Sequence, residues 1–140
     1  MEAKEYIDKR LNESVLAYHG TNKRFKSFNP NAVPINDTGY MGVGSYFNQE
    51  YRHAKQYALM TIDIGGGTPI VYTVELNLDK TFLINDKQHT QDKVRTQAID
   101  WTKSLISKGY DSTTNGNGEY CVFDSSKIKI IKIEEVEDDT

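Results

Sequence analysis

The stretch SVLAYHGTNKRFKSF, residues 14–28, decides how the rest of the chain is interpreted. Residues 15–18 form a short apolar run of the strand type, and His19, Gly20 and Thr21 follow at its end. Residues 22–44 are rich in Asn, Gly and Pro, as expected of a long irregular loop. Loops of this length in compact domains often carry function, so the end of this strand is the first candidate for a site.

A second strand passes directly into a helix within SYFNQEYRHAKQYALM, residues 45–60. The pattern predicts the junction at Phe47 and Asn48, with Asn48 as the helix N-cap. Ala54, Tyr57 and Ala58 then recur at helical spacing. The helix is therefore expected to start close behind the second strand.

The remaining segments add more strands and another helix. Alternating or apolar runs predict strands at residues 70–78, 81–84, 119–124 and 127–133. One apolar stripe predicts a helix over residues 90–109, formed by Val94, Ala98, Trp101 and Leu105. A further short helix is expected within the first dozen residues. Two or three helices among five or six strands, without regular alternation, predict an α+β fold whose mixed or mostly antiparallel sheet is split around a cleft.

Composition limits the class of protein. With 140 residues, 37% of them hydrophobic, the chain is long enough for one domain with a single core, which we assign to residues 1–133. Residues 134–140 carry five acids and no base, predicting a flexible acidic tail and leaving residues 1–133 with a formal charge of +2. This near-neutral balance disfavours general nucleic-acid binding. One cysteine, no long apolar run and a charged N-terminus predict a cytoplasmic protein without a membrane segment.

Three motifs remain that could carry chemistry: YHGT at 18–21, GYMGVGSYF at 39–47 and GEYCVFD at 118–124. Each alone has an ordinary structural explanation, as a capping His, a core aromatic residue or an exposed acid at a strand edge. His53 and His89 are interpreted as exposed helix or loop residues, and Cys121 as a core thiol. No cluster has metal-ligand spacing, so no metal is expected. The GYMGVG segment lacks the third glycine and the setting of a dinucleotide fingerprint.

Taken together and in this order, the three motifs resemble the ADP-ribosyltransferases of the diphtheria-toxin and poly(ADP-ribose) polymerase branch, whose signature is His, Tyr and Glu on three separated strands. The chain is also similar to small ADP-ribosyltransferase domains in polyvalent proteins of phages and mobile elements, in which GYDG precedes the acidic motif much as KGYDS does here. The resemblance extends over residues 16–130. It implies an ADP-ribosyltransferase-like fold around a cleft for NAD.

The resemblance also assigns roles to individual residues. It implies that His19 binds the adenosine ribose, that the main chain of Gly20 holds the nicotinamide carboxamide, and that Thr21 is the small hydroxyl residue that follows. Tyr46 and Tyr57 would contact the nicotinamide ring from two sides. We expect glycine at position 20 because its backbone must approach a planar amide closely.

Glu119 is the residue expected to carry catalysis. Cleavage of the nicotinamide–ribose bond builds positive charge on the ribose, and a carboxylate that holds the ribose 2′-hydroxyl stabilises that charge. Together with His19 and Tyr46 it completes the predicted catalytic set. Two positions depart from the family pattern. Ala54 stands where the polymerase branch often has a serine that bonds the carboxamide, and Asn117 replaces the first glutamate of the Glu-x-Glu pattern of arginine-directed transferases.

The function implied is a NAD-dependent mono-ADP-ribosyltransferase that releases nicotinamide and modifies a macromolecule, with protein favoured over nucleic acid. A monomer and a phage or bacterial effector role are expected, with the host cytosol as location if the protein is phage-encoded. Two alternatives stay open, an NAD glycohydrolase and a catalytically silent binding module; an RNA 2′-phosphotransferase ranks low. The sequence leaves open which acceptor is used and whether residues 29–40 gate the cleft.

Overall fold

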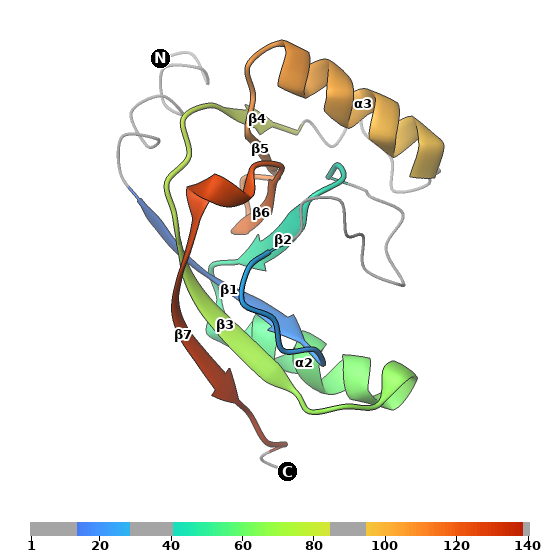
Figure 1. The fold of residues 1–140 in the computed structure, drawn as a ribbon, viewed down its shortest axis with the longest axis vertical. Helices are drawn as coiled ribbons and strands as arrows, with labels where there is room; N and C mark the ends of the chain where they lie inside the picture. The colour runs from blue at the N-terminus through green and yellow to red at the C-terminus, as the bar shows by residue number, and fades with distance from the viewer. Residues whose placement is uncertain (1–13, 29–40, 85–94, 139–140) are drawn as a thin grey trace.

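The computed structural model describes residues 14–28, 41–84 and 95–138, which form seven strands and two α-helices (Figure 1). The strands are β1 (Val15–Thr21), β2 (Ser45–Asn48), β3 (Ile70–Leu76), β4 (Thr81–Leu83), β5 (Ser112–Thr114), β6 (Glu119–Val122) and β7 (Ile128–Glu135). The helices are α2 (Tyr51–Gly65) and α3 (Arg95–Ser107), and a 3-10 turn (Ser125–Lys127) precedes β7. The helix predicted near the N-terminus and the loop at 29–40 lie outside the described residues.

The sheet is mixed and opens between two of its strands. Its order is β4-β5-β6-β2-β1-β3-β7, with β4 and β5 parallel and the other neighbours antiparallel. β1 pairs with β3 along its whole length, and β2 does so with β6. β1 and β2, by contrast, are paired only at Tyr18 and Asn48. The sheet therefore divides into two halves that diverge from this junction (Figure 1), which confirms the predicted α+β fold with a split mixed sheet.

Helix α2 packs closely on β1 because the residues between them are small. A Cβ atom on Gly20 would lie 1.9 Å from the carbonyl oxygen of Ala54 and 2.9 Å from the backbone nitrogen of Ala58. Ala54 and Ala58 are themselves the buried residues of the helix. The backbone of α2 takes the space of the missing side chain, which is a reason for glycine that the sequence did not indicate. The contact with a planar amide stays a prediction.

Apolar side chains of the described residues form separate buried clusters, and one of them spans both halves of the sheet. The largest lies on β1, β2, β3 and β6 and includes Phe47, Tyr72 and Leu76. A second cluster joins α3 to β6 through Leu105 and Cys121. Cys121 has no exposed surface, in agreement with its interpretation as a core thiol. In α3, Ala98 and Leu105 are buried and Trp101 is half-buried, as the stripe predicted, while the side chain of Val94 lies outside the described residues.

Asn48 does not cap α2. The N-cap is Glu50, and Asn48 instead ends β2, where its Oδ1 accepts a hydrogen bond of 2.8 Å from the backbone N–H of Glu50. The side-chain acceptor expected at the cap therefore stabilises the turn before the helix. At the other end of the chain, β7 continues through Glu135 and Val136 is buried. The boundary expected at residue 133 thus falls inside a strand.

Strand β5 was not predicted from the sequence. Its three residues, Ser112, Thr113 and Thr114, are all polar, yet all are buried between β4 and β6. Their hydroxyl groups are satisfied internally, and Thr113 donates to the carbonyl of Met41 at 2.6 Å. A hydrophobic pattern cannot reveal such a strand. Across the described parts of the chain, no helix has the length and apolar character needed to span a membrane.

Candidate functional site

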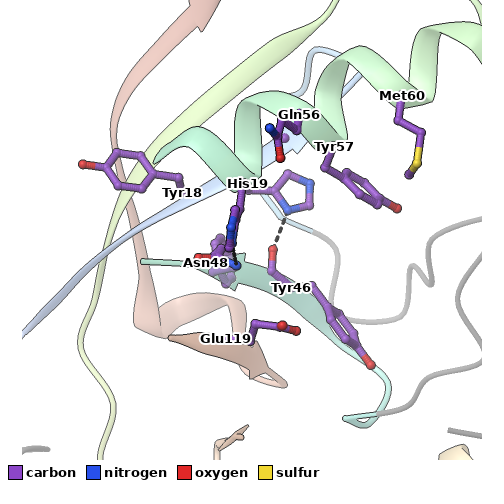
Figure 2. Close-up of a pocket in the computed structure, with 11 residues that line it drawn as sticks. Tyr18, His19, Tyr46, Asn48, Gln56, Tyr57, Met60 and Glu119 are labelled. Atoms are coloured by element: carbon purple, nitrogen blue, oxygen red, sulfur yellow. Dashed lines mark hydrogen bonds between the residues drawn. The ribbon is translucent and has the colours of Figure 1, made fainter. Parts of the chain in front are cut away.

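A cleft of about 450 Å³ lies where β1 and β2 separate, and α2 contributes residues to one of its sides (Figure 2). This volume falls within the range of small-molecule sites. Five of the six predicted site residues line it: His19, Gly20, Tyr46, Tyr57 and Glu119. Thr21 is not among the lining residues, and its Oγ1 accepts a hydrogen bond from the backbone N–H of Lys23 at 3.2 Å.

His19 bridges the gap between the diverging strands. Its Nδ1 atom lies 2.6 Å from the carbonyl oxygen of Tyr46, on the neighbouring strand β2 (Figure 2). A carbonyl oxygen only accepts, so Nδ1 must carry the proton and donate it. In the neutral ring, the other nitrogen, Nε2, is then a hydrogen-bond acceptor. The contact to Tyr46 thus determines the tautomer of the imidazole.

The environment of His19 also favours the neutral ring. Its imidazole makes edge or tilted contacts with four aromatic rings, with centroid distances from 5.0 to 6.3 Å, those of Phe25, Phe28, Phe47 and Tyr72. Burial lowers the pKa of His19 below its ordinary value of 6.5, and the hydrogen bond to Tyr46 opposes this only in part. His19 is therefore placed as a neutral acceptor at neutral pH.

Tyr46 lines the cleft and at the same time fixes the loop that leads into β2. Its hydroxyl donates to the carbonyl oxygen of Gly42 at 2.7 Å and accepts from the backbone N–H of Met41 at 3.0 Å. These two bonds are local, within five residues of the tyrosine, and they anchor Met41 and Gly42 in the segment that leads into β2. The hydroxyl is thus used by the fold, while the ring borders the cleft.

Helix α2 presents one face to β1 and another to the cleft. Ala54 and Ala58 form the buried face, whereas the cleft is lined by residues at the spacing i, i+3, i+4 and i+7: His53, Gln56, Tyr57 and Met60. Ala54 itself does not line the cleft, so a side chain at this position faces β1 instead. The side chains available to a ligand on this helix are aromatic, amide, imidazole and thioether groups (Figure 2).

A tight turn at residues 115–118 positions Glu119 at the start of β6. Asn115 Oδ1 accepts hydrogen bonds from the backbone N–H groups of Asn117 and Glu119, at 2.8 and 3.3 Å. The carbonyl oxygen of Gly118 accepts from the N–H of Gln49 at 2.8 Å, which ties the turn to the end of β2. Among the described residues, no hydrogen bond or ion pair engages the Glu119 carboxylate, which borders the cleft (Figure 2).

Three cross-strand neighbours form a row at this end of the cleft. Asn48 on β2 is the register partner of Glu119 on β6 and of Tyr18 on β1. Register partners place their side chains on the same face of a sheet, with Cβ atoms about 4.5–5.5 Å apart. All three residues line the cleft, so the carboxylate of Glu119 lies beside a polar amide and near a tyrosine.

Sequence reasoning missed five lining residues: Tyr18, Asn48, His53, Gln56 and Met60. Phe47 also lines the cleft, although it was predicted only as part of the strand–helix junction and not as a site residue. The strand period could have found Asn48, two positions after Tyr46, and the helical period could have found His53 and Met60 from Tyr57. The interpretation of His53 as only an exposed helix residue was incomplete, because the residue is about half exposed but borders the cleft. In the described segments no three His, Cys, Asp or Glu side chains are grouped to hold a metal ion.

A split mixed sheet, with His, Tyr and Glu from three separate strands around the cleft at its opening, defines an ADP-ribosyltransferase-like fold. A family model described as ADP-ribosyltransferase in polyvalent proteins matches residues 13–137, most of the chain, and the protein belongs to this family. The match includes every predicted site residue. No curated protein matches the sequence. Membership implies ADP-ribosylation as the general activity, with NAD as the substrate and a macromolecule as the acceptor.

Proposed function

We propose that the protein is a NAD-dependent mono-ADP-ribosyltransferase that moves ADP-ribose from NAD to a macromolecular acceptor and releases nicotinamide. The observation that carries this proposal is the convergence of His19, Tyr46 and Glu119 on one cleft, together with Gly20 and Tyr57. These residues come from three strands and a helix that are distant in sequence. Their chemistry suits the three parts of NAD that a transferase must hold: the adenosine ribose, the nicotinamide ring and the reacting ribose.

His19 is proposed to bind the adenosine ribose. With Nδ1 donating to Tyr46, the neutral ring offers Nε2 as an acceptor for a ribose hydroxyl group. Protonation would turn that acceptor into a donor, and the lowered pKa of His19 counters protonation near pH 7. Burial of the ring among aromatic residues therefore supports the binding role directly.

Tyr46 and Tyr57 are proposed to enclose the nicotinamide ring. The oxidised ring is flat and positively charged, so tyrosine faces attract it by stacking and by cation–π interaction, worth about 1–2 kcal/mol when water is excluded. Gly20 also lines the cleft, and its main chain is proposed to bond the carboxamide. Because Ala54 faces β1, no hydroxyl from that position assists, and the carboxamide is held by fewer contacts than in the polymerase branch.

Glu119 is proposed as the catalytic residue. Its carboxylate would accept a hydrogen bond from the 2′-hydroxyl of the nicotinamide ribose and stabilise the positive charge that develops as the bond to nicotinamide breaks. Transfer of a single unit to a protein acceptor, a monomeric state, a cytoplasmic location and a role as a phage or bacterial effector complete the proposal. These last features rest on the sequence alone.

The test is nicotinamide release from NAD by the wild type, Glu119→Ala and Asn117→Ala, with and without a bacterial lysate. Asn117 is an exposed residue of the same turn and does not line the cleft, so it is the matched control. We expect Glu119→Ala to lower the rate about 10²–10³-fold, as when one stabilising group for a transition state is removed. Asn117→Ala should match the wild type.

Intact-mass analysis of the lysate separates the remaining alternatives. Nicotinamide release with added mass on a protein supports the transferase. Release with free ADP-ribose and no added mass points to an NAD glycohydrolase. A folded protein that binds NAD but releases no nicotinamide would refute both enzymes and leave a binding module.

A further inference from the structure

A second set of polar side chains lies beside Glu119 at the mouth of the cleft and is not used by the roles above. His53 Nε2 lies 3.4 Å from the carboxylate of Glu50, and His53 Nδ1 lies 3.4 Å from the side-chain nitrogen of Asn48. Asn48 Oδ1 in turn accepts from the backbone N–H of Glu50. The three residues thus form a closed set of contacts between the end of β2 and the first turn of α2.

These contacts define the hydrogen-bonding state of the imidazole. Since Asn48 Oδ1 is occupied by the N–H of Glu50, its amide nitrogen faces His53 and donates to Nδ1. When the ring is neutral, its proton is then on Nε2, which lies at ion-pair distance, 3.4 Å, from the Glu50 carboxylate. In this carboxylate–imidazole pair the carboxylate faces Nε2, and the electron pair of the opposite nitrogen, Nδ1, accepts the long contact from Asn48.

The lone pair of His53 Nδ1 is on the side of the Glu119 carboxylate. Nδ1 of His53 faces Asn48, and Asn48 is the register partner of Glu119. Asn48, His53 and Glu119 all line the cleft. At 3.4 Å, the contact between Asn48 and Nδ1 is longer than an ordinary hydrogen bond, so an incoming hydroxyl group could replace it.

A purely structural role explains this set poorly. The side chains of His53 and Glu50 are 49% and 63% exposed, and exposed ion pairs of this kind contribute little to stability. Glu50 caps α2 without a side-chain hydrogen bond, so its carboxylate is not needed for the helix end. What the arrangement does provide is an oriented, half-exposed proton acceptor among the residues that line the cleft.

We propose that His53, oriented by Glu50, is the general base that activates the acceptor, and that the nucleophile which it deprotonates is a hydroxyl group. This inference rests on the proposed transferase function. In the step, the bond between ribose C1′ and the nicotinamide nitrogen breaks and its electron pair leaves with neutral nicotinamide. A bond between C1′ and the acceptor oxygen forms, and the proton of the hydroxyl passes to Nδ1 of His53. A carboxylate acceptor would have no proton to lose and would need no such base.

The experiment measures NAD turnover with two defined hydroxyl nucleophiles, water and methanol, by quantifying nicotinamide, ADP-ribose and methyl ADP-ribose. The key variant is His53→Gln, whose amide keeps a donor for Glu50 and an acceptor for Asn48 but takes no proton. His53→Ala is used for rescue with added imidazole. Arg52→Ala is the control, because Arg52 is an exposed neighbour in the same helical turn and does not line the cleft.

We expect kcat with both nucleophiles to fall about 10²-fold in His53→Gln and His53→Ala, the lower part of the range for general base catalysis, with little change in KM for NAD. Imidazole should restore the activity of His53→Ala but not that of Glu119→Ala. Glu50→Gln should show a smaller loss than either His53 variant, and Arg52→Ala should match the wild type.

The outcomes separate this inference from the function on which it rests. If the wild type releases nicotinamide and His53→Gln is equally active, the role of His53 is refuted while the transferase proposal stands. A loss in His53→Ala that imidazole does not restore, or one seen mainly as a raised KM for NAD, indicates a structural role and also refutes it. If the folded wild type turns over no NAD, the proposed function is refuted, and so is the role of His53 as general base.

Discussion

Gly20→Ala tests whether the packing of α2 on β1 has the closeness that the structure shows. The new Cβ would lie 1.9 Å from the Ala54 carbonyl oxygen, and the atoms that it meets belong to the backbone of the helix and cannot rotate away. Ordinary contact requires about 3.5 Å, so helix and strand would have to separate by roughly 1.5 Å along their contact. Overpacking of a core costs about 1–3 kcal/mol, and a clash with rigid backbone belongs at the upper end.

We therefore expect Gly20→Ala to lower the free energy of unfolding by about 3 kcal/mol and Tm by about 10 °C, measured by urea titration and thermal melting. The control is Gly65→Ala at the end of the same helix. There the nearest atom to a new Cβ is the amide nitrogen of the Asn22 side chain at 3.0 Å, which can rotate away. That variant should stay within about 1 kcal/mol of the wild type, because alanine also favours the helix. Equal stabilities for the two variants would refute the packing argument.

Three further outcomes follow from hydrogen bonds and burial. Tyr46→Phe keeps the ring but removes the acceptor of the Met41 backbone N–H and leaves the carbonyl of Gly42 with the weak donor Cys121 Sγ. The free energy of unfolding should therefore fall by about 1–3 kcal/mol in urea titration, with KM for NAD changed less than threefold or so. Asp111→Ala removes the acceptor of two backbone N–H groups and one hydroxyl, and a loss of about 2–3 kcal/mol is expected in the same measurement. His19 binds a proton less readily in the folded than in the unfolded chain, because its pKa is lowered on folding. Its contribution to the free energy of unfolding is therefore present above pH 6.5 and is lost below it, by at most about 1.4 kcal/mol per pH unit. His19→Gln should flatten that part of a profile of the free energy of unfolding against pH.

The parts of the fold that could be predicted are those whose burial has a period. β1, β3 and α3 carry apolar residues at the spacing of their element. β5 was not predicted because its buried residues are serine and threonine. Such residues fit a core only where their hydroxyl groups find hydrogen-bond partners, such as the carbonyl of Met41, and only the tertiary structure supplies these partners. The start of α2 was not predicted at Glu50, because Asn48, two residues earlier, accepts a backbone N–H in a turn just as an N-cap side chain would.

The candidate site divides in the same way. His19, Tyr46 and Glu119 were predicted because their motifs resemble those of a known family, and all three line the cleft. The strand end predicted at His19 was wrong, because β1 continues through Thr21. His53 was interpreted only as an exposed residue, although its helical spacing from Tyr57 could have indicated a place on the cleft. Its relevance depends on the pairing of Asn48 with Glu119, a contact between strands that are far apart in sequence. Local patterns thus locate the elements of the cleft, but the partners across it depend on register.

His19 links the shape of the cleft to its chemistry. The carbonyl group of Tyr46 faces β1, where a continued ladder would pair it with a backbone N–H, but the imidazole of His19 occupies that place and donates instead. The ring therefore satisfies the backbone at the point where the strands diverge, so the sheet opens there without leaving a buried carbonyl unpaired. The same bond places the proton on Nδ1 and leaves Nε2 as the acceptor proposed for the adenosine ribose. A small residue at position 19 would remove both the acceptor and the group that holds the strands apart, so a variant such as His19→Ala should lose NAD affinity by narrowing the cleft as well as by losing a contact.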